Sequence, residues 1–293
     1  MKDLRQAMKG ILPAAQPPGP LFHYTTLEAL LKILESGKMW ASDLGFVNDP
    51  SELAYGLALV KKRVAERRKQ SPGDGESTVL DVLEQAAEIR AIQDTAGDSR
   101  FFAFSLTGNG DLLSQWRGYA PKGDGASLSF LAVDLIAAAE AQNYLLVECR
   151  YSQEQQNDLI DRLVDQARQA AIEAPQDDLE RGLWNDLIMP GLLAILPMLK
   201  HEAFKEEKEW RAVFGPWALS FPDTMFRARD RRIIPYLEFE LPRDPDDENR
   251  LAVEHVVIGP GPHQELSAMA VRGLLQRIAG KRAKLALSQI PFR

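Results

Sequence analysis

HEAFKEEKEWRAVF, residues 201–214, interleaves acidic, basic and aromatic side chains at a spacing of two. In an extended chain, successive side chains point to opposite faces of a sheet. A strand over Glu207–Phe214 therefore has an apolar face and a charged face. The apolar face holds Trp210, Ala212 and Phe214, and the charged face holds Glu207, Glu209 and Arg211. Such a charged face is either solvated, as in many half-buried strands, or lines a cleft.

The composition is that of a globular protein, with 45% hydrophobic and 26% charged residues among 293. The net charge of −7 argues against a general nucleic-acid coat but leaves room for a local basic patch. The single cysteine, Cys149, excludes an intramolecular disulfide and fits a reducing compartment, where it should pack as a small apolar residue. No signal-peptide core or membrane-length apolar run is present, so we expect a cytoplasmic protein of bacterial type without a membrane partner.

The order of elements favours one α+β domain with mixed or antiparallel sheets. Residues 1–20 end in the Pro/Gly-rich QPPGP and are expected to form an extended N-terminal arm. The single domain then spans 21–293. It contains a helical insert at about 152–200, which Pro190 and Pro197 should kink or divide.

The segment LFHYTT begins the predicted domain with a strand over Leu21–Tyr24. Either Thr25 or Thr26 can cap the amphipathic helix that follows over Leu27–Ser36. His23 is therefore expected on a strand, immediately before a helix start.

A second informative stretch is RFFAFSLTGNGDLLSQWRGY. Its pattern predicts a buried strand over Phe101–Leu106, a glycine-containing loop over Thr107–Gly110, and Asp111 as the cap of a short helix with Trp116 and Arg117. A strand, a glycine loop and a helix start in this order can present backbone N–H groups to an anion.

A basic segment, FRARDRR at residues 226–232, carries four arginines and one aspartate. Arginines at this density can contact phosphates, although a solvated strand end has the same composition. Both interpretations stay open at the level of the sequence.

Several motifs together resemble an uncharacterised bacterial family of unknown function, over about Leu21 to Arg293. They are FHYTT, LLKILESGKMWAS, VNDPSE, DLLSQWRGYA, KHEAFKEEKEWR, VVIGP and SQIPFR. That family is distantly similar to the ADP-ribosyltransferase superfamily. The resemblance implies an ADP-ribosyltransferase-like fold, NAD as a substrate, no metal, and a macromolecular acceptor that is either protein or nucleic acid.

The resemblance also implies roles for residues in the same chain order. His23 would bind a ribose from an early strand, Ser105 or Thr107 would act from a middle strand, and Glu207 and Glu209 form the late Glu-x-Glu motif. Breaking the nicotinamide–ribose bond builds positive charge on the sugar, which a carboxylate beside it stabilises. The middle-strand hydroxyl would orient that carboxylate.

The remaining binding residues follow from the chemistry of a dinucleotide. Tyr24 or Trp116 would stack on nicotinamide or a base, with Thr25 beside them in the HYT motif. Arg117 or Arg211 would meet the pyrophosphate. If these roles hold, His23, Ser105 and Glu209 should converge on one cleft.

Two other classes of protein are alternatives to an ADP-ribosyltransferase. Carboxylates with a lysine suit a metal-dependent phosphodiesterase, although Lys208 would face away from Glu207 and Glu209 in a regular strand. The residues of that reading are Asp49, Asp111, Glu207, Lys208 and Glu209. The other class is a non-enzymatic recognition module of a defence or stress system, with Trp40, Trp116, Trp210 and the arginines as its surface.

Overall fold

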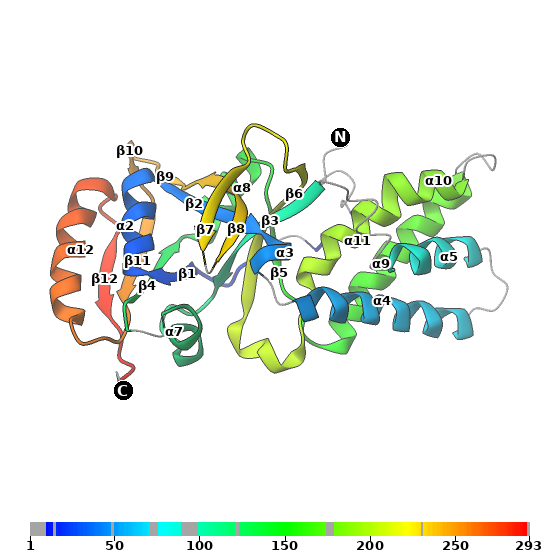
Figure 1. Cartoon of the computed structure of the whole chain (residues 1–293), viewed down its shortest axis with the longest axis horizontal. Helices are drawn as coiled ribbons and strands as arrows, with labels where there is room; N and C mark the ends of the chain where they lie inside the picture. Colours follow the sequence, from blue (N-terminus) through cyan, green and yellow to red (C-terminus); the bar gives the residue numbers. More distant parts are fainter. Residues whose placement is uncertain are drawn as a thin grey trace.

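A computed structural model describes residues 10–13, 16–47, 50–70, 76–88, 99–120, 123–173, 179–229 and 231–291. A ten-stranded sheet forms the centre of this part of the chain. Figure 1 shows one group of helices beside the sheet at the right of the view, and α2 and α12 at the left. The α+β class with a mixed, largely antiparallel sheet is confirmed.

The strand order in the main sheet is β12-β11-β4-β1-β3-β2-β8-β7, with β6 on β3 and β5 on β6. Among these pairs, β11 and β12 are parallel and the others antiparallel. A separate pair is formed by β9 (Arg243–Asp244) and β10 (Asp247–Leu251). The strands of the main sheet are β1 (Leu21–Thr26), β2 (Lys38–Asp43), β3 (Ser99–Thr107), β4 (Gly125–Phe130), β5 (Leu145–Glu148), β6 (Glu209–Ala218), β7 (Met225–Arg229), β8 (Arg232–Glu240), β11 (Val253–Ile258) and β12 (Lys284–Leu287).

Strand β3 joins the predicted motifs. One edge of β3 pairs with β6 along its length, and the other edge pairs with β2 near its start and with β1 at its end. The register sets Phe22 of β1 opposite Thr107 and sets Arg211 of β6 opposite Ser105. The LFHYTT, FSLT and EWR segments are therefore neighbours in the sheet.

The helices fall into two groups, one packed on each face of the sheet. None of the described helices combines the length and the apolarity that crossing a bilayer requires. The helical elements are α2 (Leu27–Ser36), α3 (Leu44–Val47), α4 (Pro50–Gln70), α5 (Ser77–Ala86), α7 (Leu113–Tyr119), α8 (Ala132–Ala141), α9 (Gln153–Glu173), α10 (Leu179–Leu183), the π-helical turn η2 (Trp184–Ile188), α11 (Met189–Ile195), the 3₁₀ turns η3 (Leu196–Met198) and η4 (Glu202–Glu207), and α12 (Gln264–Ile278).

Each face of the sheet buries its own core. Phe101, Ala103 and Val213 pack against α4, α5, α9 and α11 on one face. On the other face, Phe104 and Trp210 belong to the core that also contains α2, α8 and α12. The alternation of side chains along β3 and β6 thus separates two apolar layers.

More than half of the predicted N-terminal arm lies outside the described residues, and within its described part Ile11 is fully buried in the helical core. One expectation about a helix start needs correction. Asp111 does not cap α7, because the N-cap position is Leu112 and receives no side-chain bond. Of the two threonine candidates, Thr26 caps α2 through its Oγ1, which accepts from the backbone N of Ala29 at 3.2 Å.

Candidate functional site

The strand that contains Glu209 begins two residues later than the sequence predicted. Glu207 ends the 3₁₀ turn η4, and Lys208 adopts the left-handed conformation with φ 43° and ψ 48°. This turn breaks the alternation, so only Glu209 and Arg211 of the predicted charged face share a strand face. The apolar face is confirmed, since Trp210 is 5% exposed and Ala212 0%.

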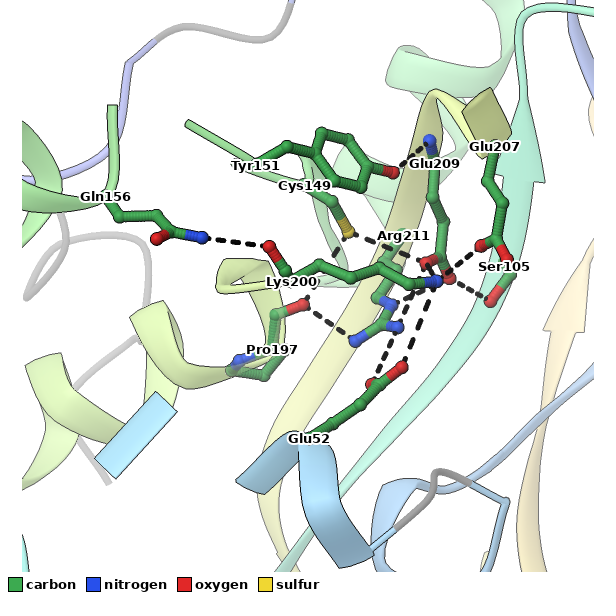
Figure 2. Close-up of polar contacts among 10 residues, drawn as sticks. All are labelled: Glu52, Ser105, Cys149, Tyr151, Gln156, Pro197, Lys200, Glu207, Glu209 and Arg211. Carbon is green, nitrogen blue, oxygen red and sulfur yellow. Dashed lines mark hydrogen bonds and ion pairs between the residues drawn. The ribbon is translucent and has the colours of Figure 1, made fainter. Parts of the chain in front are cut away.

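The carboxylate of Glu209 is the centre of a buried polar cluster (Figure 2). Its Oε1 accepts from Ser105 Oγ at 2.5 Å and from Arg211 Nε at 2.8 Å. Its Oε2 accepts from Lys200 Nζ at 2.5 Å and from Arg211 Nη2 at 3.0 Å. Burial on its own raises the pKa of Glu209, but the charges and hydrogen bonds of Arg211 and Lys200 outweigh it and lower the pKa to about 2. Glu209 is therefore a fixed anion at neutral pH.

Lys200 reaches this cluster from the end of the helical group. Its Nζ donates to Glu207 and to Glu209, at 2.5 Å in each case. Gln156 of α9 holds the lysine's backbone in place by donating from Nε2 to the Lys200 carbonyl at 2.9 Å. Burial lowers the pKa of Lys200, but the adjacent carboxylates, Glu209 foremost, raise it above its usual value. Lys200 therefore stays charged between two glutamates.

Arg211 connects the sheet to the helices. Its Nη1 donates to the Pro197 carbonyl at 2.8 Å, and its Nη2 donates to Glu52 Oε2 at 3.1 Å. Burial lowers the pKa of Arg211, yet neighbouring anions, including Glu209 and Glu52, hold it well above its usual range. The cluster therefore joins α4, η3, β3 and β6.

The two outer carboxylates are the accessible members of the cluster. The side chain of Glu207 is 27% exposed and that of Glu52 22%, whereas that of Glu209 is 6% exposed. Three glutamates and two cations leave the cluster with one net negative charge.

A small hollow opens beside this cluster. Its volume of about 10 Å³ is the space of about one water molecule. The half-exposed ring of Tyr119 forms part of its wall, and desolvation together with the charges of Glu209 and Glu207 raises the pKa of its hydroxyl. The lining residues are Phe22, Tyr24, Ser105, Leu106, Thr107, Gln115, Tyr119, Glu207 and Glu209.

His23 does not share this hollow, contrary to the prediction that it converges with Ser105 and Glu209. The register of β1 on β3 puts Phe22 and Tyr24 on the face of the hollow and His23 on the opposite face. There its ring meets the Phe104 ring edge-on with centroids 6.4 Å apart. Its Nδ1 donates to the Ser105 carbonyl at 2.9 Å, and burial lowers its pKa.

Thr25 lies on the same face as His23. It pairs with Ala126 of β4, whose side chain belongs to the core around α2 and α12. His23 and Thr25, the two residues of the HYT motif on this face, therefore do not line the hollow.

Tyr24 and Trp116 form a buried aromatic pair with ring centroids 4.6 Å apart. Tyr24 donates from its hydroxyl to the Asn109 carbonyl at 2.9 Å and accepts from the Leu112 backbone N at 2.8 Å. The indole of Trp116 donates to Asp111 Oδ1 at 2.7 Å. Both rings fix the loop between β3 and α7, and at 3% exposure neither offers a face for stacking a ligand.

The remaining predicted residues divide between the hollow and the surface. Thr107 Oγ1 donates to the Glu207 carbonyl at 2.7 Å and so fastens the turn before β6. Arg117 is exposed on α7. The structure brings together Tyr24, Ser105, Thr107, Glu207, Glu209 and Arg211 of the sequence-predicted set, and leaves His23, Thr25, Trp116 and Arg117 away from the hollow.

The metal-dependent alternative finds little support in this geometry. The ammonium of Lys200 lies between Glu207 and Glu209, where a cation would have to bind. Asp111 is engaged by Trp116, Ser288 and Gln289, and Asp49 lies outside the described residues. Within the described ranges, no group of three His, Cys, Asp or Glu side chains could hold a metal ion.

The structure also disagrees with the recognition surface that was predicted from three tryptophans. Trp116 and Trp210 are buried, at 3% and 5% exposure, and Trp40 is 36% exposed. A recognition surface built from all three tryptophans is therefore wrong.

Sequence reasoning missed Glu52 and Lys200. Both lie inside motifs that carried the resemblance, VNDPSE and KHEAFKEEKEWR, but neither had a spacing that indicated its partner. Their contacts with Glu209 and Arg211 arise only when α4 and the helical group pack on the sheet.

Residues 115–212 match the model of a family described as "Protein of unknown function (DUF2971)". The matched segment, about a third of the chain, begins in α7 and ends in β6, so it contains Lys200, Glu207, Glu209 and Arg211. The match supports the predicted uncharacterised family. No curated protein and no solved structure matches the chain significantly.

Proposed function

We propose that the hollow beside Glu207 and Glu209 receives the ribose end of NAD and that the protein is an NAD-dependent ADP-ribosyltransferase or NAD glycohydrolase. The observation that carries this proposal is the 2.5 Å bond from Ser105 Oγ to Glu209 Oε1 at the wall of the hollow. A middle-strand hydroxyl that orients a late-strand glutamate is the arrangement that the resemblance implied.

Glu209 and Glu207 have different roles in this proposal. Both oxygens of Glu209 accept bonds from Ser105, Lys200 and Arg211, so this carboxylate acts as a fixed negative charge near the reacting sugar. Glu207 is more exposed and accepts from Lys200 through Oε2, which leaves Oε1 for a ribose hydroxyl.

In the proposed reaction the bond between the nicotinamide nitrogen and the ribose carbon breaks. The electron pair leaves with nicotinamide, and the positive charge that develops on the sugar is stabilised by the net negative cluster. Water or a nucleophilic group of a macromolecular acceptor then forms the new bond to that carbon and gives its proton to solvent. None of these steps requires a metal ion.

The size of the hollow restricts how NAD binds. A volume of about 10 Å³ admits only the reacting edge of the ribose, so most of the dinucleotide lies on the outer surface. Tyr119 is the half-exposed aromatic ring at this position and takes the stacking role that the sequence assigned to Tyr24 or Trp116.

We also propose a cytoplasmic location for this bacterial-type protein. Cys149 is a free thiol, 2% exposed, which suits a reducing compartment.

The test compares Glu207→Gln with Glu206→Gln, an exposed position on the same 3₁₀ turn. NAD binding is measured by calorimetry, and nicotinamide release is measured by chromatography. We expect Glu207→Gln to reduce release at least about 100-fold with a small change in melting temperature, and Glu206→Gln to behave as wild type.

Absence of both NAD binding and nicotinamide release in the wild-type protein, across protein and nucleic-acid acceptors, would overturn the proposal. Mg²⁺ binding that is lost in Glu207→Gln would favour the phosphodiesterase class instead.

A further inference from the structure

A second group of charged and aromatic side chains lies on strands β2, β7 and β8, on the face of the sheet that carries Ser105 and Glu209. We define the arginine–aromatic surface as Trp40, Arg227, Arg229, Arg232 and Tyr236. Residues directly opposite each other in antiparallel strands share a face. Arg229 is opposite Arg232, and Ser42 is opposite both Tyr236 and Ala103. The arginine–aromatic surface therefore lies on the same face of the sheet as Ser105 and Glu209, on the strands that follow β3 in the strand order.

The aromatic and cationic groups on this surface are stacked. The rings of Trp40 and Tyr236 have centroids 4.5 Å apart, and the guanidinium of Arg227 lies 5.2 Å from the centroid of Trp40. Arg227 also donates from Nη2 to Ser42 Oγ at 2.7 Å, which fixes the guanidinium in place. Trp40 remains 36% exposed, so part of its indole is accessible although the Tyr236 beneath it is only 7% exposed.

The surface carries an excess of positive charge although the chain has a net charge of −7. Glu238 and Glu240 lie further along the same face of β8, and both are engaged by Lys38, at 2.7 and 3.5 Å. The Nε of Arg227 is buried without a hydrogen-bond partner in the described part of the chain. Burial and, to a smaller extent, the nearby charge of Arg229 lower the pKa of Arg227.

We propose that the arginine–aromatic surface binds single-stranded nucleic acid. Arg227 and Arg229 are two residues apart on one strand, roughly 7 Å, and Arg232 lies directly opposite Arg229, so these three arginines can contact successive phosphates of an extended strand. The exposed part of Trp40 stacks a base. Proteins that bind single strands with little sequence preference combine cationic side chains along the nucleic-acid backbone with aromatic rings that stack on the bases. An acidic peptide would use the cations but would gain little from the aromatic stack.

This proposal stands apart from NAD chemistry. Glu207 and Glu209 are not part of the surface, so nucleic-acid binding can be measured in Glu207→Gln, in which NAD cleavage is expected to fail. Loss of one activity without the other distinguishes failure of the two proposals.

The experiment measures fluorescence anisotropy of labelled oligo(dT) and oligo(rU) of about 20 nucleotides, with full-length protein over a range of salt concentrations. The test variant is Arg229→Gln with Arg232→Gln, and the control is Arg272→Gln with Arg277→Gln. The control residues are exposed arginines on α12, so both double variants change the net charge equally.

We expect the test variant to weaken binding about tenfold and to reduce the slope of log affinity against log salt by about 1.4, for two phosphate contacts. Trp40→Ala should weaken binding about tenfold, and Trp40→Phe should restore most of it, because phenylalanine keeps a stacking face. A preference for oligo(dT) or for oligo(rU) shows whether the surface favours the thymine–deoxyribose strand or the uracil–ribose strand, and it supports the proposal in either case.

Three results would overturn the proposal. They are no salt-dependent binding by the wild-type protein, an equal loss in the α12 control, and equally tight binding of a polyglutamate peptide that displaces the oligonucleotides. The last result would assign the surface to an acidic protein partner.

Discussion

Replacing Glu209 by glutamine should remove about 3 kcal/mol from the free energy of unfolding at pH 7. Glutamine has nearly the shape of a protonated glutamate, so the substitution imitates protonation of the carboxyl. Folding lowers the pKa of Glu209 from 4.5 to about 2. At about 1.4 kcal/mol for each pH unit, this corresponds to about 3 kcal/mol. Breaking a buried ion pair generally costs about 3–5 kcal/mol, which agrees with this figure.

The same reasoning predicts how the effect depends on pH. A carboxyl with a depressed pKa contributes its full stability above its unfolded pKa and loses it as pH falls through the folded pKa. The contribution of Glu209 is therefore complete above about pH 5 and declines between about pH 4.5 and 2. Wild type and Glu209→Gln should approach equal stability toward the acid end of this range.

Urea denaturation followed by tryptophan fluorescence, repeated from neutral pH to the lowest pH at which the protein stays folded, measures this difference. Glu202→Gln serves as the control, because the Glu202 side chain is 68% exposed and its 3.4 Å pair with Lys205 is solvated. We expect the control to change stability by less than about 1 kcal/mol at every pH. Parallel pH profiles for wild type and Glu209→Gln would refute the reasoning.

Three further predictions concern single positions. Ser105→Ala should lower the free energy of unfolding by about 1.5 kcal/mol, because Glu209 loses one hydrogen bond to a charged group; urea denaturation measures this, and no change would contradict the 2.5 Å bond. Gly37→Ala should cost about 1 kcal/mol and Gly37→Asn less, since this C-cap has φ 69°; equal melting temperatures for both variants and wild type would argue against the cap. Cys149 should react slowly with iodoacetamide in the native protein and rapidly in urea, because burial raises its pKa; mass spectrometry that finds rapid native labelling would contradict its burial.

The pattern of side chains around Trp210 predicted much of the central strand. The alternation correctly assigned Trp210 to the core and Arg211 to the opposite face. It failed at Glu207, because a spacing of two continues through EKE while the backbone turns at Lys208. A periodic pattern shows which side chains share a face but does not show where the strand begins.

The failure for His23 has a different physical cause. Which face His23 occupies relative to Ser105 depends on the register between β1 and β3, and a shift of one residue would exchange the two faces. Nothing local to FHYTT determines that register. Contacts of Lys200 and Glu52 with the cluster depend likewise on packing between elements far apart in the chain, so composition and spacing could not predict them.

The two glutamates separate a structural role of the cluster from a chemical one. Glu209 is held by the cations that join the helices to the sheet, so any loss of activity in Glu209→Gln includes the effect of a weakened fold. Glu207 contributes one partly exposed ion pair, so its substitution should affect stability much less. If Glu209→Gln shows the expected pH-dependent instability while Glu207→Gln leaves NAD binding and nicotinamide release unchanged, the cluster is a structural connection between sheet and helices. If Glu207→Gln abolishes nicotinamide release at an unchanged melting temperature, the same cluster supplies the negative charge for the reaction. A purely structural cluster would lose more from substitution of the buried Glu209 than from substitution of the exposed Glu207.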